Sequence, residues 1–215
     1  MRDSTNKQIG VLTKIAFNGD TVWQRIYRDP DPDEDVIPQM ATASVDGGFL
    51  ITGFFQHWTQ HYSKCLLIKT DAQGNELWRK KIGKAAPDVQ DGRAIVQDSI
   101  SGKIIITGYQ YVGAKPDVMV NIIVLDSIGG LINHAAYIPG SGQDLIQARN
   151  KAMLVVGGRK YDDPLVDRQS YICEFDLNNP QFPSWKTVLN DTNYTSVFSA
   201  VRELSNGNFL AAQTI

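Results

Sequence analysis

Short apolar runs separated by turn-forming residues recur along the whole chain. Nearly continuous apolar runs occur at Leu66–Ile68, Ile104–Ile106 and Ile122–Leu125. This is the pattern of strands that are covered on both faces. Asp, Asn, Ser and Gly cluster between such runs, and these residues form turns because Gly adopts positive φ and Asp or Asn bonds its own backbone. No segment of useful length combines a helical period with an N-cap signal. The pattern therefore predicts an all-β fold.

The strands and turns repeat along the sequence. The segment Lys69–Trp78 follows Lys14–Trp23 by 55 positions, and the same turn returns within Leu125–Gly130. A second recurring segment, Asp46–Gly53, has a later copy at Ser101–Gly108. A fixed period of this length indicates stacked supersecondary units.

Each repeat contains two hairpins, and four-stranded units stacked face to face are the blades of a β-propeller. The repeat units cover approximately residues 9–64, 65–120, 121–170 and 171–215. We therefore predict a single all-β propeller domain of four-stranded antiparallel blades, with about four blades' worth of sequence. We expect the core between blades to contain the apolar positions of the second hairpin: Phe49, Leu50, Ile51, Ile104, Ile105, Ile106, Leu154, Val155, Phe209 and Leu210.

The first and last hairpins each resemble half of a blade. The hairpin near residues 9–27 matches the outer half of a unit, and the hairpin near 198–215 matches an inner half. These halves could complete one blade, which would close a ring of four, the low end of the range for propellers. The alternative is that the chain is part of a larger propeller. We expect the second arrangement, because the chain stops at the end of a predicted strand.

The repeat resembles a group of bacterial propellers. The order Lys69-Thr70-Asp71, Gly74 and Trp78, together with the hairpin sequence Asp46–Gly53 that lies between the first two copies of this turn, is similar to the repeats of secreted and surface proteins of Bacteroidetes-type bacteria. It is distantly similar to pyrroloquinoline-quinone-type repeats. The resemblance implies an extracellular, cell-surface or periplasmic location, although the first residues lack the apolar core of a secretory signal. The interval from Asp71 to Gly74 is one residue shorter than in quinone-type repeats, so we predict no cofactor.

The position of each tryptophan in the repeat distinguishes a predicted packing role from a predicted ligand-binding role. Trp23, Trp78 and Trp185 recur at one repeat position, which predicts a packing role because a ligand needs no copy in every blade. Trp58 lies outside that position, beside the polar groups of Gln56 and His57. An apolar ring among polar donors suits sugar or peptide binding.

Binding residues usually lie on variable loops of a rigid scaffold, and the longer connections of this chain carry aromatic residues that the repeat does not require. The other interpretation is that these aromatics simply rest on the blade tops. We predict a ligand-binding face composed of Gln56, His57, Trp58, Tyr62, Tyr109, Tyr111 and Tyr161.

Metal and thiol chemistry find little support in the sequence. His57 and His61 are four positions apart in a non-helical segment without an evident third ligand. The segment Asp29–Asp35 has five carboxylates but lacks the turn glycine of an EF-hand loop. We therefore expect a solvated acidic loop and no metal site. Cys65 and Cys173 occupy different repeat positions, which favours two small buried side chains over a disulfide.

The composition of the chain and the absence of known catalytic motifs limit the classes of function that we expect. The net charge of −2 provides no basic field for nucleic acid, and no apolar run is long enough to span a membrane. Nucleophile-elbow and phosphate-loop motifs are absent from the sequence. We expect a non-catalytic binding or scaffold propeller of a bacterial surface or secreted protein that engages a glycan or a protein through its longer loops. The alternative is a glycoside hydrolase or lyase with carboxylates on those loops.

Overall fold

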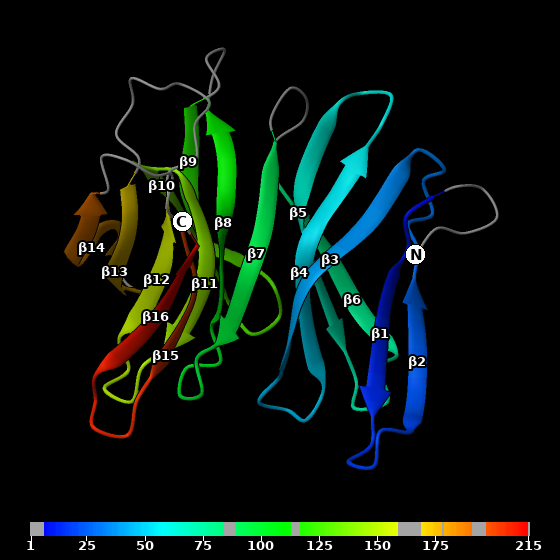
Figure 1. Cartoon of the computed structure of the whole chain (residues 1–215). Helices are drawn as coiled ribbons and strands as arrows, with labels where there is room; N and C mark the ends of the chain where they lie inside the picture. The colour runs from blue at the N-terminus through cyan, green and yellow to red at the C-terminus, as the bar shows by residue number, and fades with distance from the viewer. Residues whose placement is uncertain are drawn as a thin grey trace. The chain divides into compact units, whose positions relative to one another are not determined.

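The fold consists of antiparallel β-sheets (Figure 1). The computed structural model describes residues 7–83, 89–112, 117–158, 169–177, 179–190 and 197–214. No helix occurs among them, so none of the described residues belongs to a helix that could cross a membrane. The all-β prediction is confirmed.

Strands that follow one another in sequence are neighbours in the sheets. The first four-stranded sheet contains β3 (Glu34–Ala43), β4 (Phe49–His57), β5 (Tyr62–Thr70) and β6 (Glu76–Ile82). The second contains β7 (Gln90–Gln97), β8 (Ile104–Val112), β9 (Asp117–Leu125) and β10 (Leu131–Pro139). The third contains β11 (Ser141–Gln147), β12 (Met153–Gly158), β13 (Gln169–Asp176) and β14 (Asn179–Asn190). Two-stranded sheets precede and follow these, formed by β1 (Gly10–Ile15) with β2 (Thr21–Tyr27), and by β15 (Val197–Glu203) with β16 (Phe209–Thr214).

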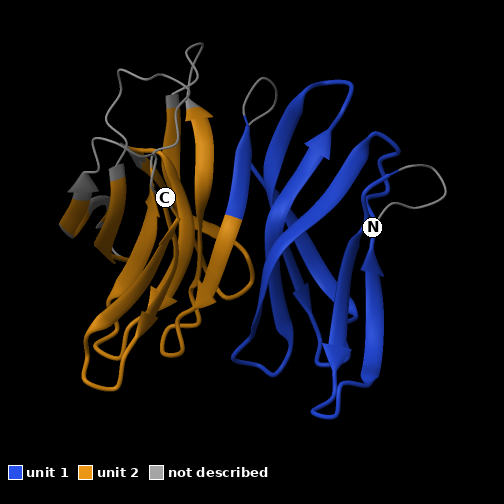
Figure 2. Ribbon diagram, viewed as in Figure 1, with its two compact units in different colours: residues 1–92 blue, residues 93–215 orange. Residues whose placement is uncertain are grey.

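The chain divides into two compact units, residues 1–92 and residues 93–215 (Figure 2). The division falls within β7. Unit 1 contains the β1–β2 sheet and the β3–β6 sheet, and unit 2 contains most of the β7–β10 sheet together with the two later sheets.

The core of unit 1 lies between its two sheets. A buried cluster joins β2, β3, β4 and β5, and Leu12 of β1 packs against it; its members are Tyr27, Val36, Ile51, Phe55, Leu66 and Ile68. Trp23 of β2 meets the ring of Phe49 edge to face, with centroids 5.8 Å apart. The same indole lies over Gly74, where an added Cβ would be 2.7 Å from a Trp23 ring carbon. The predicted packing role is thus confirmed for Trp23.

In unit 2 the apolar runs are buried as the sequence pattern predicts. Ile104, Ile105 and Ile106 of β8 are at most 1% exposed, as are Leu154 and Val155 of β12. The β15–β16 sheet contributes Phe198 and Val201 to a cluster with Val156.

The core prediction is wrong at the end of the chain. In unit 1, Leu50 and Ile51 are buried and Phe49 is half-buried, but the equivalent Phe209 and Leu210 of β16 are 36% and 63% exposed. The difference follows from position in the sheet. The predicted core strand of each four-stranded sheet is an inner strand, whereas β16 is an edge strand of a two-stranded sheet.

One end of the hairpins has tight turns that close on their own backbone. Gly74 N donates to Asp71 O at 3.1 Å, and the Asp71 side chain accepts from the backbone of Gln73 and Asn75 at 2.9 and 2.8 Å. Glycines with positive φ occupy the equivalent corner of most turns: Gly19, Gly47, Gly74, Gly102, Gly129 and Gly207. Lys151 stands at this corner in the β11–β12 turn with φ of 73°, a conformation that costs a residue with a Cβ.

Both cysteines are buried and unpaired. Burial in apolar surroundings raises the pKa of Cys65 and of Cys173 to about 12. Their interpretation as small buried side chains is confirmed, and neither thiol is activated for nucleophilic chemistry.

Candidate functional site

The acidic segment Asp29–Asp35 covers the connection from β2 to β3 and the first two residues of β3, at the loop end of the β3–β6 sheet. The expectation of a solvated loop is wrong for three of its carboxylates, because Asp29, Glu34 and Asp35 are 9%, 4% and 1% exposed. The counter-charges of Asp29 and Glu34 come from β6, more than forty positions later in the chain, whereas Asp35 accepts hydrogen bonds from Trp58 Nε1 and Gln8 N. Lys81 Nζ contacts Glu34 and lies 3.0 Å from Asp29 Oδ2, and Arg79 lies 3.4 Å from the same Asp29 oxygen.

Lys81 is the cation shared by the two buried carboxylates. Burial disfavours its charge, but the hydrogen bonds to Glu34 and Asp29 outweigh burial and raise the pKa of Lys81. Its ammonium also lies 4.7 Å from the centre of the Phe55 ring. The segment is therefore held in place by ion pairs and a cation–π contact that join distant parts of the chain.

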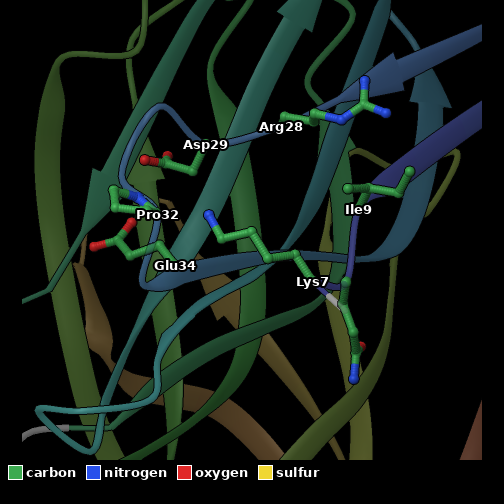
Figure 3. A pocket seen from close by; sticks show the side chains of 7 residues that line it. Lys7, Ile9, Arg28, Asp29, Pro32 and Glu34 are labelled. Atoms are coloured by element: carbon green, nitrogen blue, oxygen red, sulfur yellow. The ribbon is translucent and has the colours of Figure 1, made fainter. Parts of the chain in front are cut away.

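A cavity of about 280 Å³ lies beside this loop (Figure 3). Its wall combines both signs of charge with apolar surface, contributed by Lys7, Gln8, Ile9, Arg28, Asp29, Pro32 and Glu34. Lys7 Nζ donates to the backbone oxygen of Asp31, which joins the segment before β1 to the acidic loop.

The connection that carries Trp58 is shorter than the sequence suggests. β4 extends to His57 and β5 begins at Tyr62, so only residues 58–61 turn the chain. Trp58 is held in this turn by one side-chain and one backbone hydrogen bond: its Nε1 donates to Asp35 Oδ2 at 2.9 Å, and its backbone N donates to Asp33 O at 3.3 Å. Trp58 nevertheless remains 47% exposed. The turn presents an aromatic surface whose orientation is fixed.

The predicted neighbours of Trp58 differ in what they offer to a ligand. His57 is 5% exposed, so it is not the open donor that the sequence suggested. Tyr62 donates to Glu34 Oε1 at 3.0 Å, and desolvation together with Glu34 raises its pKa. The rings of His57 and Tyr62 are 5.1 Å apart. Gln56 is half-buried on the adjacent position of β4.

Two further predicted aromatics, Tyr109 and Tyr111, belong to unit 2. Tyr109 and Tyr111 lie within strand β8, not in a loop, and their rings meet edge to face at 5.8 Å. Arg93 is centred 5.0 Å over the Tyr109 ring and donates to Gln143 Oε1 at 2.8 Å. Tyr161 lies outside the described residues.

Sequence reasoning missed a cluster of three ligand-type side chains. The ligand atoms of Asp31, Asp33 and His57 all lie within 4.8 Å of one another. The β3–β4 register pairs Glu34 with His57, so the residues just before Glu34 lie beside the end of β4. That register was the missing signal, since the acidic residues and the histidine are separated by more than twenty positions.

Comparison with known proteins gives a likeness in fold. No protein-family model matches the chain, and no curated protein matches it. A crystal structure of a protein of unknown function from Bacteroides caccae is similar with a TM-score of 0.54 at 11% identity, over 96% of this chain and 65% of that one. Hydrazine synthase from Kuenenia stuttgartiensis gives a TM-score of 0.33 at 7% identity, over 77% of this chain and 51% of that one. The chain thus spans less than two thirds of the length of the Bacteroides protein.

Proposed function

We propose that the four-stranded sheets are blades of a β-propeller, and that the protein is a non-catalytic binding or scaffold module of a bacterial surface or secreted protein. The sequential order of strands within each sheet and the half-sized sheets at the two ends support the propeller. The partner is a glycan or a protein, and it binds at the loop end of unit 1.

The binding proposal rests on the exposure and the hydrogen bonding of Trp58. The residue is 47% exposed, while its indole N–H already donates to the carboxylate of the buried Asp35. The exposed ring face thus has no polar group that needs water. A pre-oriented ring loses little conformational entropy when it binds, and a flat apolar face suits the C–H face of a sugar or an apolar side chain.

The carboxylates of the same region favour binding over hydrolysis. A glycosidase needs one carboxyl group that can hold a proton and a second that acts as base or nucleophile. Asp29 and Glu34 both line the cavity, but both contact Lys81 Nζ. Each carboxylate is already paired with the same ammonium, so neither presents a free carboxyl group to a substrate.

The test is a glycan array and a protein pull-down with wild type, Trp58→Ala and Trp58→Phe. We expect Trp58→Ala to lose binding at least tenfold and Trp58→Phe to keep most of it, because phenylalanine retains an aromatic face. Phe17→Ala is the matched control, since Phe17 is fully exposed in the β1–β2 turn at the other end of unit 1. Unchanged binding by Trp58→Ala would reject the proposed site, and turnover of a polysaccharide would reject the non-catalytic role.

A further inference from the structure

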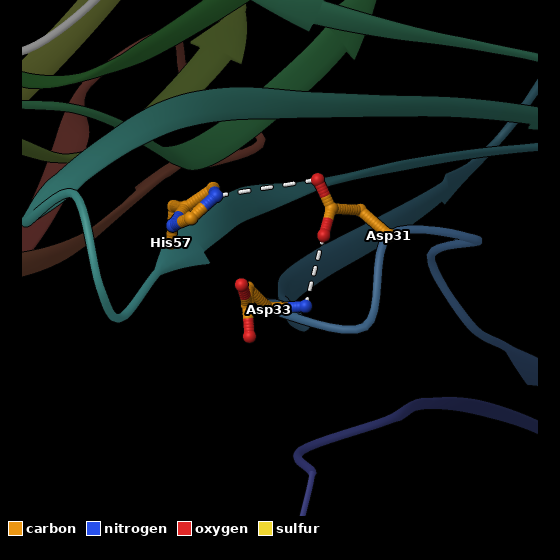
Figure 4. Close-up of side chains that lie close together, drawn as sticks. All are labelled: Asp31, Asp33 and His57. Atoms are coloured by element: carbon orange, nitrogen blue, oxygen red, sulfur yellow. Dashed lines mark hydrogen bonds and ion pairs between the residues drawn. The ribbon is translucent and has the colours of Figure 1, made fainter.

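Three side chains that could bind a metal ion converge where the acidic loop meets the end of β4 (Figure 4). Asp31 and Asp33 come from the loop and His57 comes from the last position of β4. Asp31 Oδ2 lies 4.0 Å from His57 Nε2, and the other Asp31 oxygen accepts from the Asp33 backbone N at 2.9 Å. The Asp31 side chain is 44% exposed and Asp33 is exposed, so solvent has access to this cluster.

The orientation of His57 supplies an observation that is independent of the carboxylates. The residue is 5% exposed, and its two ring nitrogens face different surroundings. Nδ1 faces the turn, 3.3 Å from the Gln60 amide N and 3.3 Å from Thr59 Oγ1. Nε2 faces Asp31, but 4.0 Å exceeds hydrogen-bond length, and no other described residue bonds it. The side chain of His57 is 6% exposed, and its Nε2 faces the Asp31 carboxylate without a hydrogen bond to any described residue, in a group whose ligand atoms all lie within 4.8 Å of one another.

We propose that Asp31, Asp33 and His57 bind a divalent first-row transition ion such as Zn²⁺ or Mn²⁺. One imidazole nitrogen with two carboxylates is a ligand set that these ions accept, and water can complete the coordination. Ca²⁺ prefers a shell made entirely of oxygen ligands, so the histidine selects against it. This proposal is independent of the proposed role of Trp58.

Metal binding requires a change of tautomer at His57. The amide of Gln60 donates to Nδ1, which leaves the ring proton on Nε2, whereas a metal needs the Nε2 lone pair. The proton must therefore lie on Nδ1, where Thr59 Oγ1 is placed to accept it. The exchange replaces the Gln60 contact with a hydrogen bond from His57 to Thr59. Such outer contacts orient metal-binding histidines and affect affinity.

Calorimetric titration of the full chain with Zn²⁺, and separately with Ca²⁺, tests the site. We expect one saturable Zn²⁺ site per chain and Ca²⁺ binding at least tenfold weaker. Asp33→Asn should weaken Zn²⁺ binding by about tenfold or more, and Thr59→Val should weaken it by a similar factor. Both positions are in the loop or the turn, so these variants avoid the risk of misfolding that the buried His57 carries.

The matched control is Asp20→Asn, which removes the same charge from an exposed aspartate in the β1–β2 turn. Its Zn²⁺ affinity should equal that of wild type. The proposal is overturned if wild type shows no saturable Zn²⁺ binding, or if Asp33→Asn and Asp20→Asn bind the ion equally. Electron paramagnetic resonance with Mn²⁺ gives a second readout, because the signal of bound Mn²⁺ should decrease in Asp33→Asn and remain unchanged in Asp20→Asn.

Discussion

The two ends of the unit 1 sheets are held by different forces. At one end, the turns close on themselves: Gly19 N bonds Ala16 O at 2.9 Å and Gly74 N bonds Asp71 O at 3.1 Å. At the other end, the loop before β3 is fixed by Lys81 and Arg79, which belong to β6. Local hydrogen bonds can be read from a few consecutive residues. An ion pair across such a sequence distance forms only when the strands have assembled.

This difference coincides with where the candidate binding features lie. The self-contained turns leave little polar surface in need of a partner, whereas the loop end combines a cavity, the exposed Trp58 ring and the Asp31–Asp33–His57 cluster. The following predictions test whether the loop end depends on distant contacts in the way the structure indicates.

The largest effect is expected from Lys81→Met. Two carboxylates with side-chain exposures of 2% and 4% would lose their shared cation, and breaking a buried ion pair on one side costs about 3–5 kcal/mol of the free energy of unfolding. Partial exposure of Lys81 places the expected loss at the lower end of that range. Urea denaturation measures it. Lys80→Met removes a neighbouring exposed ammonium and should cost less than about 1 kcal/mol; equal losses would contradict the role of Lys81.

A pair of glycine substitutions tests the turns. Gly19 and Gly74 both have positive φ, but a Cβ at Gly19 meets nothing within 4 Å, whereas one at Gly74 overlaps the Trp23 ring. Gly19→Ala should cost about 1–2 kcal/mol for conformation alone. Gly74→Ala should cost about 2 kcal/mol more, because overpacking is added. Thermal and urea unfolding of both variants give the difference, and a difference near zero would reject the packing of Trp23 on this turn.

Lys151→Gly should stabilise the protein by about 0.5–1 kcal/mol. Lys151 has φ of 73° at a corner where most other turns have glycine, and glycine adopts this conformation without a steric cost. Asn150→Gly, one position earlier, is the control and should not stabilise. The measurement is the unfolding midpoint. A destabilised Lys151→Gly variant would mean that the lysine side chain contributes more than its backbone costs.

The smallest effect concerns the pH dependence of the β7–β8 turn. Burial acts to raise the pKa of Asp98, but hydrogen bonds from Ser101 and Gln147 outweigh it and lower the pKa from 3.8 to about 2. A carboxylate whose pKa is lower in the folded than in the unfolded protein stabilises the fold at pH values above the pKa of the unfolded protein. This stabilisation is lost as the pH falls through the pKa of the folded protein. The stability difference between wild type and Asp98→Asn should therefore shrink from pH 4 to pH 2. A constant difference over that range would contradict the assignment.

Some features of the structure could be predicted from the sequence and others could not, as particular residues show. The runs Ile104–Ile106 and Ile122–Leu125 predict buried strands, and those residues are at most 1% exposed. Asp71 and Gly74 predict a turn, and the turn is present. The sequence also singled out Trp58, but placed it in a long loop. It could not show that β4 and β5 continue to within four residues of each other, because polar residues such as Gln56 and Ser63 fit a strand as well as a loop.

The sequence by itself determined the strands, the tight turns and the all-β class, since each follows from the properties of residues that are close together in the chain. Only the tertiary structure determined which carboxylates of the acidic segment are buried and which groups compensate their charge. Five carboxylates within seven positions indicate a solvated loop until Lys81 is brought beside two of them and His57 beside two others. Burial of charge depends on which distant groups compensate it, and that compensation is set by strand pairing between residues far apart in the sequence.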